Sequence, residues 1–432
     1  MAGKTTASTG WYRLDNAAKI IPSTARGANT RVFRITCELV EEVNPEILQQ
    51  AVDETIVEFP YFNSILKRGL FWYYLEDSGL SCKVEKDHLP ACAPLYIPGR
   101  KNLLYRINYY HRRINLEMFH VLADGTGGFM FFRRLVTRYL ELAHDFHVDP
   151  AAFDSDAAST QEKSDDAFRQ FYQRGRGLAQ LKQMSSLHAH RLEGIEDENL
   201  EPHLLEGCVS ASRFVEAAHQ YGTTVGVLSV SVYIAALIDG MSLAQKKHPI
   251  VVSVPVNLRQ FFRSNTARNF FGVINIEYYP EQYDGTMESI TGVVAAEFAE
   301  KLSQEQVAKT MNSYAALERN YAIKVVPLFA KDLAIQQFDA AARRGVTTSI
   351  SNMGQIRMPA ETYPFIDHFG GFMTAASQQI TICSFGDRMV FGEVSPFATH
   401  KSMLCFFRRL TGMGIPVTLA TNDYDERPEE DV

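Results

Sequence analysis

The sequence lacks the motifs that most often assign a chain to a chemical class. It has no HExxH, GxSxG or P-loop pattern, and its six cysteines never form a CxxC pair. These are the usual signatures of zinc proteases, serine hydrolases, nucleoside triphosphatases and redox dithiols. Because the cysteines are scattered through a chain long enough to bury a core, we expect reduced thiols and no metal site.

Long charged runs and long apolar runs are also missing. The net charge is −7, and no block of Lys and Arg is long enough to grip a phosphate backbone, which argues against nucleic acid as a partner. The longest apolar stretch, Val225 to Leu237, falls short of the roughly 20 residues that a bilayer requires, so we expect a buried core helix and no membrane span. The first residues show no apolar segment typical of a signal peptide, and we expect a cytoplasmic protein.

The length and composition predict a globular protein with more than one packed unit. The chain has 432 residues, of which 46% are hydrophobic and 22% are charged. We predict an amino-terminal subdomain over residues 1–160, a linker helix region over 161–205 and a carboxyl-terminal subdomain over 206–432. The small, polar and acidic residues of 151–166 are typical of a surface linker.

Strand and helix patterns alternate along both halves of the chain, which predicts an α/β fold with mixed sheets flanked by helices. Asn44 and Pro45 are typical of a helix start, and Gly386-Asp387 is typical of a two-residue hairpin turn. Strands are predicted over residues 31–40, 63–66, 71–76, 103–110, 113–119, 250–256, 273–279, 380–385 and 389–394. Helices are predicted over 45–58, 129–143, 212–221, 225–241, 287–318, 325–343 and 399–410.

The most informative segment is RRINLEMFHVLADGTGG, which contains His120 and Asp124. Strand alternation places His120 on the same face as Leu116 and Met118, so its imidazole is expected to point inward from a strand end. Burial favours the neutral imidazole, which is the form that accepts a proton. Asp124 lies in a turn, where it could orient the loop, cap the following helix or pair with a distant arginine.

Five stretches together resemble the chloramphenicol acetyltransferase-like superfamily of HxxxD acyltransferases. HVLADG (His120 to Gly125) resembles the HxxxDG signature that ends a strand in that superfamily. The other stretches resemble bacterial alcohol-acetyltransferase-like proteins, and they occur in the expected order: WYRLDNAAKIIP (Trp11 to Pro22), VPVNLRQFF (Val254 to Phe262), NFFG (Asn269 to Gly272) and SISNMG (Ser349 to Gly354). The superfamily also includes the condensation domains of peptide synthetases.

The resemblance implies two subdomains of related topology with a channel between them. It implies that His120 is the general base, which takes a proton from an acceptor hydroxyl or amine that attacks a thioester. It also implies that Asp124, followed by Gly125, is a structural residue that pairs with an arginine. Arg259 is the candidate partner, and Arg268 lies nearby in the sequence.

Two departures from the superfamily pattern bear on the reaction and on the oxyanion donor that we expect. Condensation domains typically have a second histidine before the motif, where this chain has Phe119, and this favours an alcohol acyltransferase over amide formation. The DFGWG motif of plant-type enzymes is missing, so the donor for an oxyanion is unassigned. Ser351, Asn352 and Ser384 are the candidates, although a structural hydrogen-bonding role is the favoured interpretation for each of them.

The sequence therefore predicts an acyltransferase that moves an acyl group from acyl-CoA to an alcohol. One alternative is a condensation-type enzyme that uses an acyl-phosphopantetheine donor on a carrier protein, and another is a non-catalytic binding protein with the same fold. We expect a small-molecule thioester donor, an alcohol or amine acceptor, no tightly bound cofactor and a monomer. Acyl chain length and acceptor identity depend on the shape of the channel, which the sequence does not give.

Overall fold

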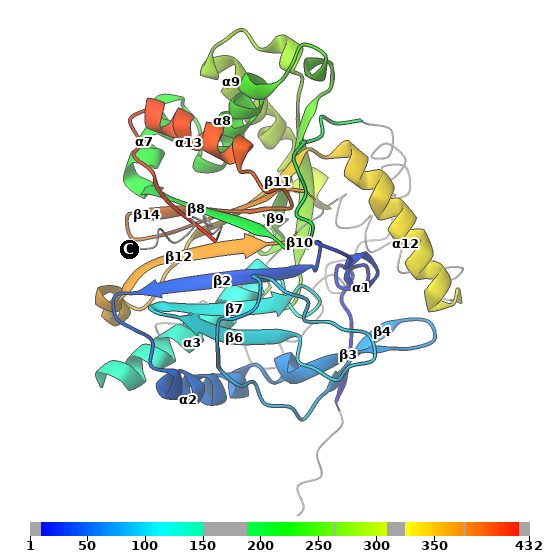
Figure 1. Ribbon diagram of the computed structural model, residues 1–432, viewed down its shortest axis with the longest axis vertical. Coiled ribbons are helices and arrows are strands. Elements are labelled where there is room, and N and C mark those ends of the chain that lie inside the picture. Colours follow the sequence, from blue (N-terminus) through cyan, green and yellow to red (C-terminus); the bar gives the residue numbers. More distant parts are fainter. Residues whose placement is uncertain are drawn as a thin grey trace, which may run out of the picture.

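Two lobes, each with a β-sheet and flanking helices, lie one above the other in the computed structural model (Figure 1). The structure describes residues 10–149, 188–199, 201–262, 264–308, 325–374 and 377–422. The predicted α/β class with mixed sheets is confirmed. The surface linker expected over 151–166 and most of the expected linker helix region lie outside the described residues.

The first lobe contains a five-stranded sheet in the order β12-β2-β7-β6-β5, in which β12 spans Ile366–Met373. Helices α2 and α3 pack against each other beneath this sheet (Figure 1). A separate three-stranded sheet has the order β1-β4-β3. The bounds are β1 (Trp11–Arg13), β2 (Val32–Leu39), α2 (Pro45–Thr55), β3 (Ser64–Arg68), β4 (Tyr73–Asp77), β5 (Glu85–Lys86), β6 (Tyr105–Tyr110), β7 (Arg113–Phe119) and α3 (Gly125–His144).

The second lobe contains a seven-stranded sheet in the order β10-β9-β11-β13-β14-β8-β15. Its strands are β8 (His203–Ser210), β9 (Ile250–Asn257), β10 (Phe271–Tyr278), β11 (Thr348–Gln355), β13 (Gln379–Phe385), β14 (Arg388–Ser395) and β15 (Thr418–Thr421). Its helices are α7 (Ala211–Gln220), α8 (Val225–Gly240), α9 (Met287–Lys301) and α13 (Lys401–Gly412).

Local signals in the sequence explain where several elements begin and turn. The Asn44 side chain accepts hydrogen bonds from the backbone N–H groups of Glu46 and Ile47, so the predicted cap of α2 is confirmed. The predicted hairpin between β13 and β14 is also confirmed, and Gly386 adopts a φ of +54° there. The apolar run from Val225 forms α8, which is buried along most of its length. In the described part of the chain, no single helix could cross a membrane by length and composition, although the bent pair α7 and α8 passes that test jointly.

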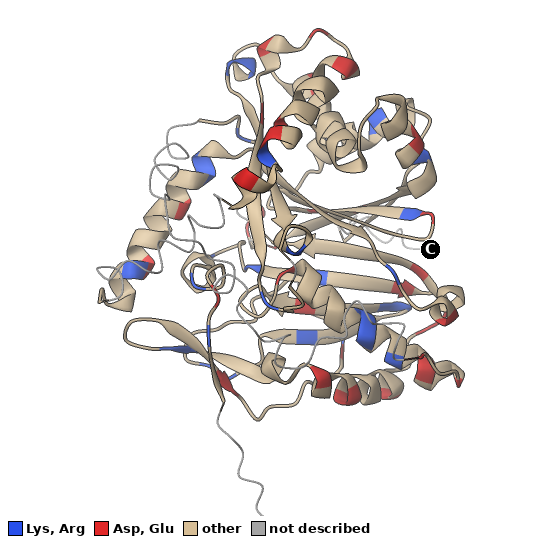
Figure 2. Ribbon diagram, turned by 180° about the vertical axis from the view of Figure 1, so that it is seen from behind, with Lys and Arg blue, Asp and Glu red and all other residues tan. Residues whose placement is uncertain are grey.

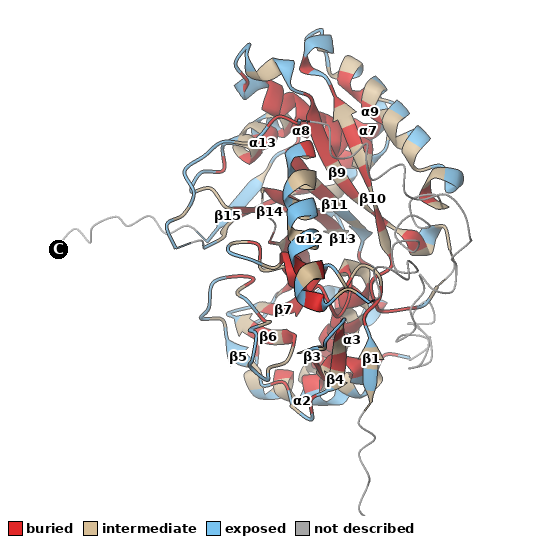
Figure 3. Ribbon diagram, turned by 90° about the vertical axis from the view of Figure 1, so that its right-hand side faces the viewer, coloured by how far each residue is buried: buried red, intermediate tan, exposed pale blue. Residues whose placement is uncertain are grey.

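Helix α12 (Leu328–Ala342) lies apart from both sheets. It contacts the short helix α1 (Ile21–Thr24), and Figure 3 shows it outside strands β9, β10 and β11. Phe329 and Leu333 are exposed on α12, whereas Leu328 at its start is buried. The helix therefore bridges the two lobes on one side of the molecule.

The expected helix does not extend over residues 188–199. The backbone N–H of Ala189 donates to the carbonyl of Arg344 at 2.9 Å, and that of His190 donates to Pro249 at 2.8 Å. These bonds to distant segments replace the bonds that a helix would make within itself. The following segment also differs from the expectation, because strand β8 begins at His203.

Strand β12 (Ile366–Met373) joins the lobes, because it belongs to the second half of the chain and yet pairs with β2 in the first sheet. Beside it, Glu206 of β8 accepts hydrogen bonds from Arg113 of β7 at 3.1 and 3.2 Å and from His368 of β12 at 3.1 Å. Burial alone would raise the pKa of Glu206, but His368 and Arg113 lower it to about 2. Burial would likewise lower the pKa of His368, but the bond to Glu206 raises it. This ion network links three strands of the two sheets.

We expect the His368–Glu206 pair to stabilise the fold most in mildly acidic solution. Because the folded state raises the pKa of His368, the stabilisation is complete below the ordinary value of 6.5 and is lost as the pH rises through the raised pKa. The stabilisation that Glu206 contributes is present above pH 4.5, and it is lost as the pH falls toward 2.

The measurement is urea unfolding of the wild type and of His368→Gln between about pH 5.5 and 8.5. We expect the variant to be less stable at the acidic end, by roughly 2–4 kcal/mol, and the difference to shrink as the pH rises. His219→Gln on α7, where the side chain is exposed, is the matched control. A difference that stays constant over this range would contradict the role of the charged pair.

Candidate functional site

His120 directly follows the last residue of β7, and its side chain is buried, with 9% of the residue exposed. Its backbone N–H donates to the carbonyl of Arg31 at 3.0 Å, which fixes the strand end against the start of β2. The rings of Phe33 and Phe271 lie 5.5 and 5.4 Å from the imidazole, measured between ring centroids. The imidazole therefore points inward between two aromatic rings, one from each lobe.

Asn269 determines which nitrogen of His120 carries the proton. The Asn269 Oδ1 lies 2.9 Å from His120 Nδ1. The amide nitrogen of Asn269 donates to Asp15 Oδ2 at 3.2 Å and to the His120 carbonyl at 3.0 Å, and a backbone carbonyl can only accept. Because these bonds fix the orientation of the amide, Oδ1 faces the ring and Nδ1 is the protonated nitrogen. Nε2 is then the nitrogen with a free lone pair.

Burial also sets the charge of the groups around His120. Burial lowers the pKa of His120 below its ordinary value, and the negative charge of Asp124 only partly opposes this effect. Burial raises the pKa of Asp15, although the ion pair with Arg268, at 3.7 Å, acts in the opposite direction. The neutral imidazole is thus the favoured form near neutral pH.

Asp124 caps α3 and also contacts the second lobe. Its Oδ1 accepts a hydrogen bond from the Gly127 N–H at 2.9 Å, as a helix cap does. Its Oδ2 accepts from Arg259 Nη1 and from the Phe270 N–H, both at 2.8 Å. Of the roles that the sequence left open for Asp124, the structure combines the helix cap and the arginine pair.

Arg259 lies on the short 3-10 helix η5 (Leu258–Gln260), just after β9. Besides Asp124, its guanidinium donates to the carbonyls of Thr266 and Arg268, at 2.9 Å and 2.6 Å. Arg259 is therefore a buried bridge between the turn after His120 and the loop before β10. Arg268, the other arginine considered from the sequence, pairs with Asp15 instead.

Glycines in the turn allow the second lobe to approach closely. A Cβ atom on Gly127 would lie 1.8 Å from the backbone oxygen of Ala267, a distance that no side chain can occupy. A Cβ on Gly125 would lie 2.5 Å from the terminal carbon of Met353 on β11. Gly127 is thus required by the close approach of the second-lobe backbone, whereas the flexible end of Met353 could move away from a side chain at Gly125.

A cavity of about 1580 Å³ lies between the lobes and is lined by His120, Asp124 and Gly125 of the first lobe. Residues of β9, β10, β11, β12, β13 and α12, and of the segment around α1, form most of the remaining wall. This volume exceeds the roughly 300–1,000 Å³ of a typical single-ligand pocket. The cavity can therefore hold two reactants beside His120.

The three candidate oxyanion residues occupy different positions. Ser351 and Asn352 of β11 line the cavity. The Asn352 Oδ1 accepts a hydrogen bond from the Gly354 N–H at 2.8 Å, which leaves its amide nitrogen as the donor. Ser384 on β13 is not among the residues that line the cavity, so the structure does not bring it to His120.

Two residues of this site, Asn269 and Asp15, were not identified by sequence reasoning. Both lie inside the quoted stretches NFFG and WYRLDN, so the resemblance was the one signal that pointed to their segments. The sequence assigned neither residue a role, because the hydrogen bond of Asn269 to His120 joins residues that are 149 positions apart.

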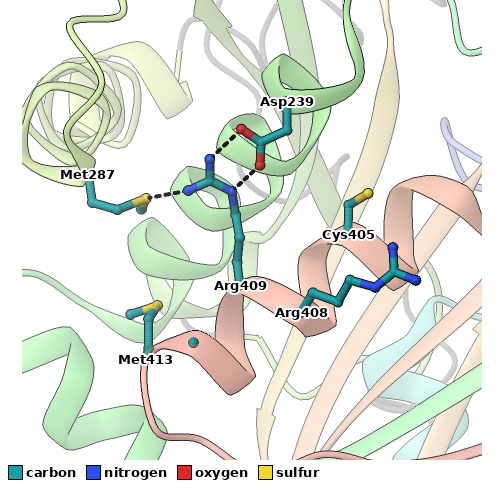
Figure 4. Close-up of a pocket in the computed structure, with 7 residues that line it drawn as sticks. Asp239, Met287, Cys405, Arg408, Arg409 and Met413 are labelled. Carbon is teal, nitrogen blue, oxygen red and sulfur yellow. Dashed lines mark hydrogen bonds and ion pairs between the residues drawn. The ribbon is translucent and has the colours of Figure 1, made fainter.

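The other features of the described residues offer less chemistry. A smaller pocket of about 400 Å³ lies between α8, α9 and α13 (Figure 4), where both oxygens of Asp239 accept hydrogen bonds from Arg409 at 2.7 Å. No group of three or more metal-ligating side chains occurs among the residues that the structure describes. Basic and acidic residues alternate over both lobes (Figure 2).

Several solved structures share this fold, whereas no family model and no curated protein sequence matches the chain. A trichothecene 15-O-acetyltransferase from Fusarium sporotrichioides gives a TM-score of 0.62 at 10% identity, covering 95% of this chain and 96% of that one. Polyketide synthase associated protein 5 from Mycobacterium tuberculosis gives 0.59 at 12% identity, covering 92% and 96%. A variant of the starter condensation domain of rhizomide synthetase, in complex with C8-CoA, gives 0.59 at 12% identity and covers 93% of each chain. The predicted resemblance to acyltransferases and condensation domains is confirmed at the level of the fold.

Replacing Gly127 is expected to disrupt the contact between the lobes. Gly127→Ala forces a methyl group against the Ala267 carbonyl, and we expect the free energy of unfolding to fall by roughly 2–3 kcal/mol. Gly292→Ala in α9 is the control, because a Cβ there meets nothing within 4 Å, and it should stabilise the helix by roughly 0.5–1 kcal/mol. Urea unfolding followed by circular dichroism measures both. Equal effects of the two substitutions would contradict the close approach.

Removing the Asn269 amide is expected to allow His120 to adopt either neutral tautomer. In Asn269→Ala, Nδ1 loses its acceptor, so both neutral tautomers of His120 should become populated. The ¹⁵N chemical shifts of labelled histidine distinguish the two tautomers, and a His120→Gln variant assigns the signals. If His120 remains protonated only at Nδ1 in the variant, Asn269 does not set the tautomer.

Proposed function

We propose that the protein is an acyltransferase that moves an acyl group from acyl-CoA to an alcohol, with His120 as general base. The observation that carries this proposal is a buried neutral imidazole, held by Asn269 with Nε2 free, in the wall of a cavity between two lobes. The likeness to a 15-O-acetyltransferase and to a condensation domain in complex with C8-CoA supports it.

The proposed reaction needs one proton acceptor and no covalent intermediate on the protein. His120 Nε2 takes the proton of the acceptor hydroxyl while the oxygen attacks the thioester carbonyl. The tetrahedral intermediate then collapses, the carbon–sulfur bond breaks, and the thiolate leaving group takes the proton from the imidazolium. The rings of Phe33 and Phe271 limit the access of water to the imidazole, and a positioned base contributes roughly 10²- to 10⁴-fold to the rate.

Asp124 and Arg259 are proposed as positioning residues and not as proton carriers. Their ion pair is buried and holds the turn after His120 against the loop that carries Asn269. Gly125 supports the same turn by allowing Met353 to approach. Loss of the pair would therefore reduce activity by displacing the imidazole.

Stabilisation of the oxyanion is proposed for β11. Ser351 and Asn352 are polar, line the cavity and lie on the strand that contacts Gly125 through Met353. Their hydroxyl and amide groups can donate hydrogen bonds to a developing negative charge. Because both lobes are contributed by one chain, we also propose that a monomer is sufficient for activity.

A second candidate is a condensation-type enzyme with an acyl-phosphopantetheine donor on a carrier protein. The starter condensation domain and polyketide synthase associated protein 5 are equally similar to this chain by TM-score. This similarity supports the condensation-type candidate. Phe119 before His120 favours ester formation over amide formation. The two candidates share the site and differ in the source of the thioester.

The test is thiol release from a panel of acyl-CoAs in the presence of pooled alcohols and amines. We expect release only when an acceptor is present, and a loss of at least about 100-fold in His120→Ala. The rate should rise as His120 loses its proton, with an apparent pKa below 6.5, because burial disfavours the charged ring. His111→Ala, where the side chain is 62% exposed, is the matched control and should keep full activity.

A wild-type protein that turns over no acyl-CoA, but does accept an acylated carrier protein, would favour the condensation-type candidate. A His120→Ala variant with unchanged turnover would contradict the general-base role.

A further inference from the structure

Basic side chains are in excess on one part of the cavity wall. This part is formed by the segment around α1, the residue before β2, helix α12 and the 3-10 helix η7 (Arg343–Gly345) that follows it. The charged residues that line the cavity here are one acidic and four basic: Asp339, and Lys19, Arg31, Lys331 and Arg343. An excess of basic side chains on one part of a cavity wall attracts an anionic ligand. Solvent screens the charge of Arg343, whose side chain is 42% exposed, more than that of Arg31, whose side chain is 24% exposed.

Arg31 contacts His120 through the backbone, because its carbonyl accepts a hydrogen bond from the His120 N–H at 3.0 Å. Its backbone has a φ of +56°, which is the left-handed region that residues other than glycine rarely adopt. Such strain persists where the surrounding structure holds the residue for a purpose. The side chain is 24% exposed and faces the cavity that His120 lines.

Arg31 and Arg343 share a single carboxylate. Arg31 Nη2 lies 3.2 Å from Asp339 Oδ1, and Arg343 forms an ion pair with the other oxygen of Asp339. Burial and the charge of Arg343 lower the pKa of Arg31, which indicates that Asp339 compensates the pair incompletely. A guanidinium offers five N–H donors, so donors remain for a second anion.

We propose that Arg31 and Arg343 bind a carboxylate of the acyl acceptor, so that the preferred acceptor is a hydroxy acid and not a neutral alcohol. This inference rests on the proposed function and names the substrate class of that site. The acceptor hydroxyl reaches His120 while its carboxylate stays at the arginines. A planar carboxylate matches the paired N–H groups of a guanidinium.

A purely structural explanation predicts a different pattern of variants. If the Arg31–Asp339 pair only ties α12 to the first lobe, Arg31→Gln and Asp339→Asn break the same bond and act alike. If the arginines bind a carboxylate, Arg31→Gln removes donors, whereas Asp339→Asn removes a competing carboxylate. The two variants then shift the affinity for an anionic acceptor in opposite directions.

The experiment is calorimetric titration of the protein with ω-hydroxyhexanoate and with hexanediol, without any thioester donor. We expect the wild type to bind the hydroxy acid more tightly than the diol. Arg31→Gln should weaken hydroxyhexanoate binding by about 10- to 100-fold and leave hexanediol unchanged. Asp339→Asn should bind the hydroxy acid more tightly than the wild type, because it removes the competing carboxylate. Arg344→Gln, an exposed neighbour that does not line the cavity, should match the wild type.

Equal affinity for the two ligands, or equal weakening by Arg31→Gln and Asp339→Asn, would overturn the inference. The alternative that the arginines bind the phosphates of the donor is tested by titrating two thioesters into the same variants. These are hexanoyl-CoA and the N-acetylcysteamine thioester of hexanoate, which has no phosphate. If Arg31→Gln weakens only hexanoyl-CoA, the arginines bind donor phosphate and the inference is wrong. Because binding is measured without turnover, hydroxy-acid binding by a protein that transfers no acyl group would contradict the proposed function and leave the anion site standing.

Discussion

The carboxylate of Asp124 is the group on which the arrangement of the site depends. One oxygen caps α3, and the other accepts hydrogen bonds from Arg259 and from the backbone of Phe270. Arg259 in turn holds the loop before β10 through two of its carbonyls. The same loop carries Asn269, which orients His120. Removing one partner of such a buried, hydrogen-bonded ion pair is strongly destabilising, because it leaves an uncompensated charge in the interior. The position of the imidazole therefore depends on both lobes at once.

A second contact between the lobes lies at strand β12. This strand belongs to the second half of the chain but pairs with β2 in the first sheet, and it places His368 next to Glu206. The Asp124 and Glu206 networks are both ionic, and both link the two lobes. The large cavity lies between lobes that are fastened in this way, so its walls combine residues from distant parts of the chain. Apolar side chains and basic side chains therefore line different parts of one cavity.

Local elements were predicted well because their signals are local. The capped start of α2, the hairpin of β13 and β14, and the buried helix α8 follow from side chains within a few residues of one another. Segments whose partners are distant were missed. Residues 188–199 were expected to be helical, yet they bond to segments near residues 249 and 344. Strand β12 was missed as well, and its pairing with β2 cannot be read from the residues within it.

The sequence by itself determined the strand that ends just before His120, the Gly-rich turn and the helix that follows, because alternation and turn residues act over a few positions. Only the tertiary structure decided which partners meet there. The bonds of His120 to Asn269 and of Asp124 to Arg259 join residues 149 and 135 positions apart. The ion pair of Arg31 with Asp339 spans 308 positions. Hydrophobic periodicity carries no information about such pairs, because they depend on how complete sheets pack against each other.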